Sequence, residues 1–313
     1  MLRHALFLAI SATAGIAGYS YVLPHALSDG WAIYMKASGK AARCSWGRVF
    51  GYYAALNRFD ALYTGYQRDL KVEEFDKENN LERFSWPGGR SFWAQRLSGR
   101  VHGFGWLLAE HHWMQESSPD SHVRKGDIVM DCGAHIGVFT WRALEAGAAK
   151  VIAVEPDPVN LECLRRNFPK EIADGRLVLA PVAVWSSPGS MKMSLGQGGN
   201  TGVNSLVTEH GQRSIDVRVT TVDLLVQELG LERIDFIKMD IEGAEREALK
   251  GARETMAKAK PRLMLDLNHR PDDAKVLPDA ILAANPGYSA ACGPCQMNEH
   301  GVPELMPHVI YFQ

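Results

Sequence analysis

The feature that most constrains the fold is the stretch IVMDCGAHIGVFT, residues 128–140. A run of β-type apolar residues reaches Asp131, and Gly133 and Gly137 then stand four positions apart before helical spacing begins. Because glycine has no Cβ, this spacing predicts a tight strand-to-helix turn that a ligand approaches closely. The competing interpretation is a turn that binds nothing, and the rest of the chain must decide between the two.

From residue 124 onward, short apolar runs alternate with amphipathic stretches, which is typical of βαβ units and a mostly parallel sheet. The helix that follows Glu155 and Pro156 is expected to begin with Asp157 as its N-cap and Pro158 in its first turn. A final strand over 308–313 is expected at the edge of the sheet. The first helix is expected over residues 137–146. The parallel strands are expected over residues 127–132, 150–156, 176–186, 233–243 and 261–269.

The fold class expected from this pattern is α/β, a doubly wound, mostly parallel sheet with an antiparallel edge and an aromatic-rich helical region before it. Sheets of this kind bind ligands beyond the carboxyl ends of their strands. The informative acids stand there, at Asp131, Glu155, Asp240 and Asp266.

Three parts are expected along the chain: a hydrophobic segment over 1–24, an accessory region over 25–123 and a ligand-binding domain over 124–313. About 19 residues, 5–23, carry no charge, so a membrane anchor, a surface-lying helix, a buried helix and a signal peptide remain alternatives. Basic residues follow this segment. By the positive-inside rule, we expect the main body of the chain to lie in the cytoplasm even if the segment spans a bilayer.

The net charge of −2 and the pI of about 6.6 provide no global basic field, so nucleic acid is not an expected partner. The five cysteines are an odd, scattered set that does not suggest a disulfide framework and that fits a reducing compartment. Cys292 and Cys295 have the Cys-x-x-Cys spacing of thiol oxidoreductases. In that fold the motif opens a helix after an early strand, whereas here it stands near the C-terminus. A loop dithiol without redox function is therefore favoured.

The ligand is indicated by the acid before the first glycine. A dinucleotide loop has the pattern G-x-G-x-x-G, whereas D-x-G-x-x-x-G places an acid that suits a cationic ligand such as S-adenosylmethionine. Glu155, at the end of the second strand, is placed to accept hydrogen bonds from both ribose hydroxyls. The expected cofactor-binding residues are Asp131, Gly133, Ala134, His135, Gly137, Glu155, Pro156 and Val182.

Two sequence blocks in this order resemble the FkbM-type methyltransferase family. The first contains VMDCGAHIGVFT and VIAVEPDPVNLECLRRN, and the second reads IDFIKMDIEGAEREALKGA. The match covers about residues 126–268. It implies a class I, S-adenosylmethionine-dependent fold and methyl transfer, usually to a hydroxyl oxygen of a sugar, polyketide or similar small molecule. The sequence departs from the family pattern at two places. His269 stands one place late, and no clear acid follows the third strand to hold adenine, which leaves Val182 or Trp185 as its neighbours.

The chemistry needs a group that takes the proton of a weakly nucleophilic hydroxyl, and Asp240 and Glu242 are the candidate catalytic residues. The alternative is a Mg²⁺ ion held by Asp240, Asp266 and Asn268, although no metal is expected. Glu245 is interpreted as an acid that stabilises the start of the next helix.

The expected function is therefore an O-methyltransferase with a small-molecule hydroxyl acceptor. The alternatives are a non-catalytic, membrane-associated scaffold that uses residues 1–24, and an NAD-dependent oxidoreductase.

Overall fold

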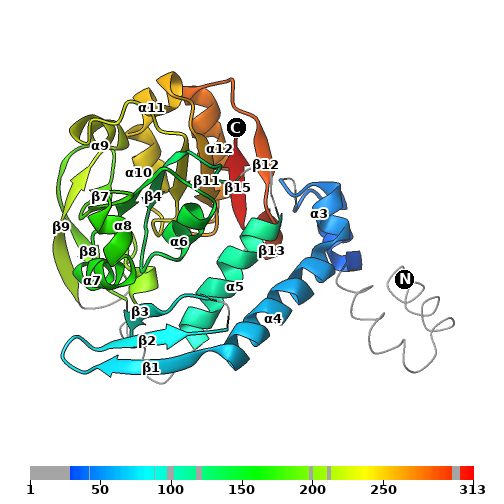
Figure 1. Ribbon diagram of the computed structural model, residues 1–313. Coiled ribbons are helices and arrows are strands. Elements are labelled where there is room, and N and C mark those ends of the chain that lie inside the picture. The colour runs from blue at the N-terminus through cyan, green and yellow to red at the C-terminus, as the bar shows by residue number, and fades with distance from the viewer. Residues whose placement is uncertain are drawn as a thin grey trace.

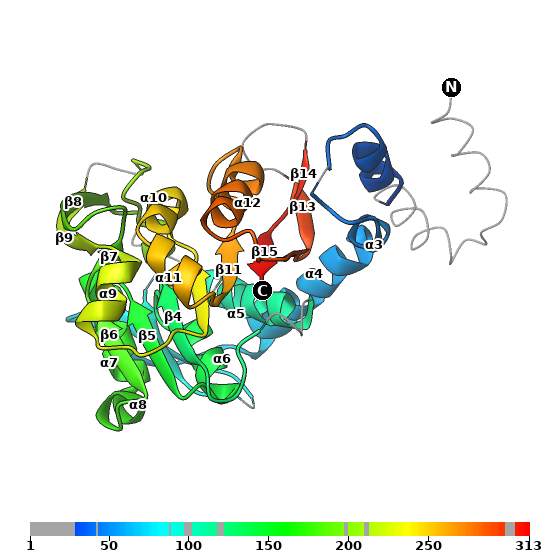
Figure 2. The same cartoon turned by 90° about the horizontal axis from the view of Figure 1, so that it is seen from above.

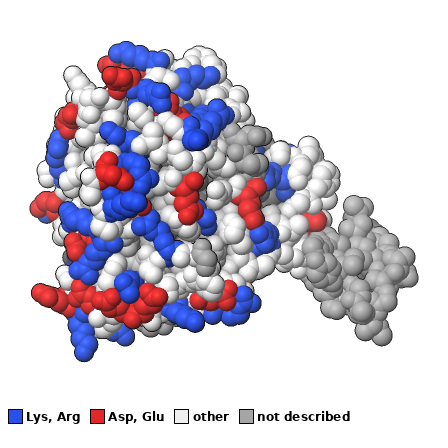
Figure 3. All heavy atoms as spheres, viewed as in Figure 1, with Lys and Arg blue, Asp and Glu red and all other residues white. Residues whose placement is uncertain are grey.

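A computed structural model describes residues 29–41, 43–87, 89–96, 102–117, 122–196, 200–209, 213–297 and 304–313 (Figure 1). The hydrophobic segment expected over 1–24 lies outside these ranges. Within them, no helix is both long enough and apolar enough to cross a bilayer. On the face seen in Figure 3, acidic and basic side chains are interspersed, and no basic stripe runs across it.

A seven-stranded sheet with helices on both faces forms the centre of the molecule, and this confirms the expected α/β fold class. The final strand is antiparallel to both of its neighbours, and the other neighbouring pairs are parallel. In spatial order the strands are β12 (Ala290–Cys292), β15 (Val309–Phe312), β11 (Arg262–Asp266), β10 (Phe236–Met239), β4 (Ile128–Cys132), β5 (Lys150–Val154) and β6 (Leu177–Ala180).

Successive side chains of the central strands point to opposite faces and pack into two separate cores. Val129 and Val151 face one core, and Met130 and Ile152 face the other. Figure 2 shows α6 on one side of the sheet and α10 and α12 on the other. The helices of this domain are α6 (Val138–Glu145), α7 (Pro158–Asn167), α8 (Pro169–Ala173), α9 (Val222–Glu228), α10 (Glu245–Lys250), α11 (Arg253–Lys258) and α12 (Asp273–Ala284).

Local signals placed one helix start correctly. The Asp157 carboxylate accepts hydrogen bonds from the backbone N–H groups of Val159 and Asn160 at 2.7 and 3.1 Å, and Pro158 occupies the first turn of α7. Asp157 is therefore the N-cap that the sequence predicts.

Two strand predictions need correction. The single strand expected over 176–186 is broken at Pro181, which has no N–H for the ladder. Its second half, β7 (Ala183–Val184), leaves the central sheet and joins β9 (Ser214–Thr220) and β8 (Gly189–Ser194). The strand expected at the edge, β15, instead lies one place inside it, because β12 pairs with its outer side.

The region before residue 124 shares its core with the α/β domain that follows it. Phe92 of the small β1–β2–β3 sheet packs against Trp141 and Phe168 with ring centroids 5.8 and 5.9 Å apart. α4 and α5 lie side by side along this core (Figure 1). The elements of this region are α3 (Trp46–Phe50), α4 (Tyr52–Asp69), β1 (Lys71–Asp76), β2 (Leu81–Ser85), β3 (Phe92–Gln95) and α5 (His102–Ser117).

A disulfide joins Cys44 to Cys295, which are 251 positions apart in the sequence. It ties the first described helices to the short hairpin of β13 (Cys295–Met297) and β14 (Leu305–Pro307). Cys292 stays a thiol and donates a hydrogen bond to the Arg43 carbonyl at 2.9 Å. The expectation that the cysteines stay reduced is therefore wrong for Cys44 and Cys295. Because disulfides persist in oxidising compartments, this pair does not support the expected reducing compartment.

Candidate active site

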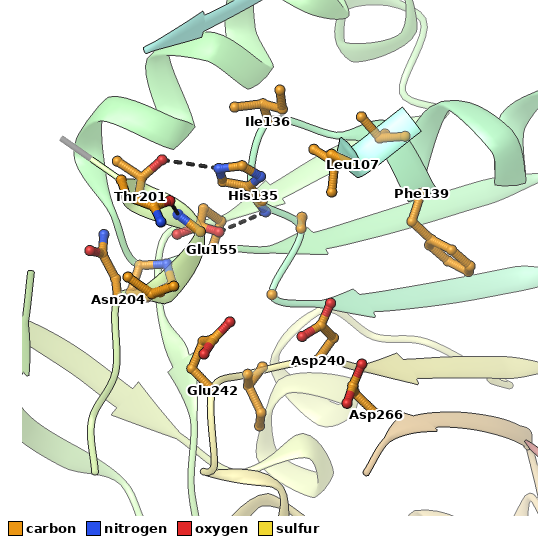
Figure 4. A pocket seen from close by; sticks show the side chains of 18 of the residues that line it. Leu107, His135, Ile136, Phe139, Glu155, Thr201, Asn204, Asp240, Glu242 and Asp266 are labelled. Carbon is orange, nitrogen blue, oxygen red and sulfur yellow. Dashed lines mark hydrogen bonds between the residues drawn. The ribbon is translucent and has the colours of Figure 1, made fainter. Parts of the chain in front are cut away.

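A cavity of about 610 Å³ lies beyond the carboxyl ends of the central parallel strands. The loop after β4 and the end of β5 line one part of it, and the ends of β10 and β11 line another. Side chains of α5 and β2 form a further wall. Figure 4 shows His135, Glu155 and Thr201 together, with Asp240 and Asp266 at a distance from them. The cavity is within the size range of small-molecule sites and lies where this fold binds ligands.

The glycine loop is shaped by the protein's own backbone as well as by any ligand. Gly133 has a φ of +76°, and a Cβ at this position would collide with the carbonyl oxygen of Asp240. Gly137 has a φ of +95° at the N-cap of α6, where a Cβ would collide with Phe168. Gly133 lines the cavity and Gly137 does not, so the expected contact between Gly137 and the cofactor is not supported.

Asp131 lies beneath the loop and is fully buried. It accepts a hydrogen bond from the Thr140 hydroxyl at 2.7 Å and lies 3.4 Å from Nζ of Lys238. Since it does not line the cavity, the prediction that it contacts the cofactor is not supported. Its role is to hold Lys238, whose Nζ donates to the Gly133 carbonyl at 2.7 Å and lies 3.6 Å from Asp240.

The Lys238 ammonium keeps its charge although it is buried. Burial alone would lower the pKa of Lys238, but the charges of Asp131 and Asp240 outweigh it and raise that pKa above its usual value. Lys238 therefore links the glycine loop to the acid that ends β10.

Glu155 is the most specific feature of the cofactor half. Its two carboxylate oxygens accept hydrogen bonds from the backbone N–H groups of His135 and Asp157 at 2.7 and 2.9 Å. Burial raises the pKa of Glu155 to about 7, although these two bonds act in the opposite direction. The Asn160 side chain also bonds to this carboxylate, which lines the cavity and so can still accept a hydrogen bond from a ligand hydroxyl.

Other predicted cofactor residues surround Glu155. Ala134, His135, Pro156 and Val182 all line the cavity, whereas Trp185 is not among its lining residues. Burial lowers the pKa of His135 to about 4, so its imidazole is neutral. The apolar Pro156 and Val182 side chains fit a flat base, and the Glu155 carboxylate fits a ribose.

A loop over residues 200–205 closes one side of the cavity and is tied to both halves. The His135 Nε2 and the Thr201 hydroxyl form a hydrogen bond of 3.0 Å (Figure 4). The Ser205 hydroxyl donates to the backbone carbonyl of Glu242 at 2.7 Å. The preceding residues 197–199 lie outside the described ranges.

The acids at the ends of β10 and β11 gather around two histidines. His269 Nε2 lies 3.6 Å from carboxylate oxygens of both Asp240 and Glu242, and its Nδ1 lies 3.0 Å from Glu245. The sequence assigned no role to His269, and the structure places it beside both predicted catalytic acids. Glu245 is fully buried and also accepts a hydrogen bond from the Ile241 N–H at 2.8 Å, so it supports the turn before α10 as well as His269.

Charges in this cluster compensate one another. Burial alone would raise the pKa of Asp240, but Lys238 and His269 lower it to about 2. Burial raises the pKa of Glu242. Although burial acts to lower it, the pKa of His269 is raised well above its usual value by the acids around it, chiefly Glu245.

The residues of the alternative metal set, Asp240, Asp266 and Asn268, all line the cavity. Asp266 accepts a hydrogen bond from the Asn268 backbone N–H at 2.9 Å and lies 3.7 Å from His308. In the described part of the chain, the acids and histidines close enough to share an ion, with ligand atoms within 4.8 Å of one another, are Asp240, Glu242 and His269.

Sequence reasoning missed the wall that α5 and β2 contribute. Phe84, Trp106, Leu107, Glu110 and His111 all line the cavity. The spacing of 107 and 111 by one helical turn is a signal that these residues share a face. Nothing in the sequence indicated that this face lies against the acids of β10 and β11, because the two are far apart along the chain.

The family model described as "Methyltransferase FkbM domain" matches residues 131–290, just over half of the chain. The chain belongs to the FkbM methyltransferase family. This confirms the sequence-based resemblance to that family. The family assignment implies the use of S-adenosylmethionine, and the comparisons provide no support for the scaffold alternative.

The curated relatives of this FkbM-family chain are also methyltransferases. It is 29% identical to methyltransferase sdnD of Sordaria araneosa over 41% of this chain and 61% of that protein. It is 28% identical to the hexuronic acid methyltransferase AglP of Haloferax volcanii, over 63% of this chain and 74% of that protein. Against the 31-O-demethyl-FK506 methyltransferase FkbM of Streptomyces tacrolimicus it is 29% identical, over 42% and 62%. The FkbM-family chain thus spans less than two thirds of two of these three relatives.

Among solved structures, the FkbM-family chain is similar to the methyltransferase FkbM of Methylobacillus flagellatus. The TM-score is 0.46 at 18% identity, over 90% of this chain and 65% of that one.

Proposed function

We propose that this chain transfers the methyl group of S-adenosylmethionine to a hydroxyl oxygen of a small-molecule acceptor. The observation that carries the proposal is that one cavity joins the Glu155 end to the acids Asp240 and Glu242. The names of two relatives agree with it, since one acts on a hexuronic acid and the other on the 31-O position of FK506.

The residues of the first half fit the cofactor. Glu155 receives the two ribose hydroxyls, and Pro156 and Val182 pack on the adenine. When bound, S-adenosylmethionine supplies a methyl group that its positively charged sulfur has already activated. Lys238 and the Gly133 carbonyl hold the loop against this ligand, so the protein's main task is to bring the acceptor oxygen into line.

The residues of the second half act on the acceptor. Asp240 and Glu242 accept hydrogen bonds from the acceptor hydroxyl and orient it, and one of the two takes its proton as the new bond forms. Correct positioning contributes at best about 7–11 kcal/mol to lowering the barrier. A positioned base adds about 10²–10⁴-fold in rate.

A cofactor-binding and transfer assay tests this proposal. Calorimetry should detect binding of S-adenosylmethionine and S-adenosylhomocysteine, and no binding of NADH. Incubation with S-adenosylmethionine labelled in the methyl group should then label members of a panel of hydroxylated glycosides, and mass spectrometry should place the methyl on oxygen. Binding of NADH in place of S-adenosylmethionine would establish the oxidoreductase alternative.

Replacing Glu155 with glutamine is expected to weaken S-adenosylmethionine binding by about ten- to hundredfold. The physical reason is the loss of charge-assisted hydrogen bonds to the ribose hydroxyls. Calorimetry measures the dissociation constant, and circular dichroism checks the fold. The matched control is Glu162→Gln on α7, whose side chain pairs with Arg166 outside the cavity. Unchanged affinity in Glu155→Gln would reject the ribose assignment.

Binding of S-adenosylmethionine is also expected to depend on pH through Glu155. The pKa of this carboxyl is about 7 without ligand, and ribose donors favour its charged form, so the pKa falls in the complex. Affinity should therefore level off above pH 7 and decline as the pH falls below it, by up to about tenfold per pH unit. Calorimetry on both sides of this pKa measures the slope, and Glu155→Gln should flatten it. An unchanged slope in the variant would assign the dependence to another group.

A further inference from the structure

The acceptor half of the cavity has two unlike walls. Leu107 of α5 and Phe139 of α6 lie on one side of it in Figure 4, with Phe104 and Trp106 of α5 as further lining residues. Asp240, Glu242 and Asp266 lie on the opposite side and point toward the space between (Figure 4). A ligand in this space therefore meets a hydrocarbon surface on one side and carboxylates on the other.

The acidic wall consists of Glu110, Asp240, Glu242 and Asp266. Its carboxylates are more exposed to the cavity than the histidines that pair with them. The side chains of Asp240 and Glu242 are 34% and 26% exposed, whereas that of His269 is 12% exposed. A second pair repeats this arrangement, because Glu110 is 21% exposed and its partner His308, 3.1 Å away, is 5% exposed. Ionised carboxylates only accept hydrogen bonds, so this wall suits a ligand rich in donors.

Cations are scarce on the cavity surface. Among the described residues that line it, Lys238 is the one lysine or arginine, and the acids are Glu110, Glu155, Asp240, Glu242 and Asp266. The Lys238 Nζ already donates to the Gly133 carbonyl and lies between Asp131 and Asp240, so it is not placed to pair with a ligand anion. His269 also lines the cavity, but its ring already lies 3.0–3.6 Å from Asp240, Glu242 and Glu245. An anionic group placed in the acceptor half would therefore face an excess of like charges, which disfavours its binding.

The acidic wall extends beyond what a cationic cofactor would need. Asp240 lies 3.6 Å from Lys238, which holds the glycine loop, so Asp240 and Glu242 by themselves do not distinguish an acceptor from a cofactor. Glu110 comes from α5, outside the cofactor-binding elements, and Asp266 lies on the far side of Asp240 from Glu155 in Figure 4. These two acids are therefore left to face the acceptor.

We infer that the acceptor is an amphipathic hydroxyl compound that carries an amine, of which an amino sugar on an apolar aglycone is the type, and that carboxylated sugars are rejected. The inference rests on the proposed function and names its substrate class. The amine and the neighbouring hydroxyls donate to the acidic wall, and the aglycone packs on Leu107 and Phe139. The chain would then differ in specificity from its relative that acts on a hexuronic acid.

Three probes with one aglycone test the inference: the 4-nitrophenyl β-glycosides of glucosamine, glucose and glucuronic acid. Calorimetry is done on the protein saturated with S-adenosylhomocysteine, which prevents turnover. The glucosaminide is expected to bind at least about tenfold more tightly than the glucuronide, with the glucoside between them. Equal binding of the three, tighter binding of the glucuronide or no binding of the glucosaminide would overturn the inference.

Substitution on α5 then assigns the preference to the acidic wall. Glu110→Gln should reduce the ratio between glucosaminide and glucuronide affinities by at least about threefold. Glu116→Gln is the matched control, because Glu116 is on the same helix, pairs with Arg58 and does not line the cavity. An unchanged ratio in Glu110→Gln would overturn the role of the wall. Binding of S-adenosylhomocysteine is measured first in the same experiment, so a failure of the proposed function is distinguished from a failure of this inference.

Discussion

Replacing Asp240 with asparagine is expected to lower the turnover number by about 100-fold or more, while the dissociation constant of S-adenosylmethionine changes little. The substitution keeps the shape of the side chain and removes the charge that orients the acceptor hydroxyl and takes its proton. Asp240 stands at the end of β10, on the acid side of the cavity, away from Glu155 (Figure 4). Steady-state kinetics on the best acceptor of the glycoside panel measures turnover, and calorimetry measures cofactor binding.

The control for this substitution is Glu254→Gln, an exposed acid on α11 that pairs with Lys258 outside the cavity. Normal turnover in Asp240→Asn would show that Asp240 has no part in the mechanism. The rate of methyl transfer would then come from the positioning of the two reactants alone. Treatment of the wild type with EDTA separates two versions of the mechanism. Loss of activity that Mg²⁺ restores would favour an ion at Asp240, Glu242 and His269, and unchanged activity favours the base.

Replacing Lys238 with methionine is expected to lower the free energy of unfolding by about 3–5 kcal/mol. Lys238 is 3% exposed, and its ammonium compensates Asp131, which is fully buried. Methionine fills a similar volume but leaves the buried Asp131 carboxylate without its cation, with the Thr140 hydroxyl as its donor among the described residues. Urea unfolding followed by circular dichroism measures the loss.

The matched control is Lys258→Met, since Lys258 is exposed and pairs with Glu254 on the surface of α11. Exposed ion pairs contribute about 0–1 kcal/mol, so this variant should unfold nearly as the wild type does. A second variant, Lys238→Met with Asp131→Asn, removes both charges and should recover part of the loss. If the single variant is as stable as the wild type, the Lys238–Asp131 pair does not hold the glycine loop as described.

Local patterns in the sequence determined the repeating part of the fold and the place of Glu155 at the cavity. Alternating apolar runs predicted the parallel strands, and Asp157 with Pro158 predicted the start of α7. Glu155 could be placed from its position alone, since the carboxyl end of a strand in this fold faces the ligand. These predictions succeed because the residues that decide them are neighbours along the chain, so their spacing carries the geometry.

Tertiary structure alone decided the rest, because each of those features depends on a contact between distant parts of the chain. Asp131 looked like a ligand from its place before Gly133, yet the burial of Lys238 from β10 turns it into a structural partner. His269 reaches Asp240 and Glu242 only through the packing of β11 beside β10. The acceptor wall on α5 and the Cys44–Cys295 bond join segments that no local spacing relates. Local spacing determines strands, helices and turns, whereas the partners of buried charges and the far wall of a cavity are set by how those elements pack.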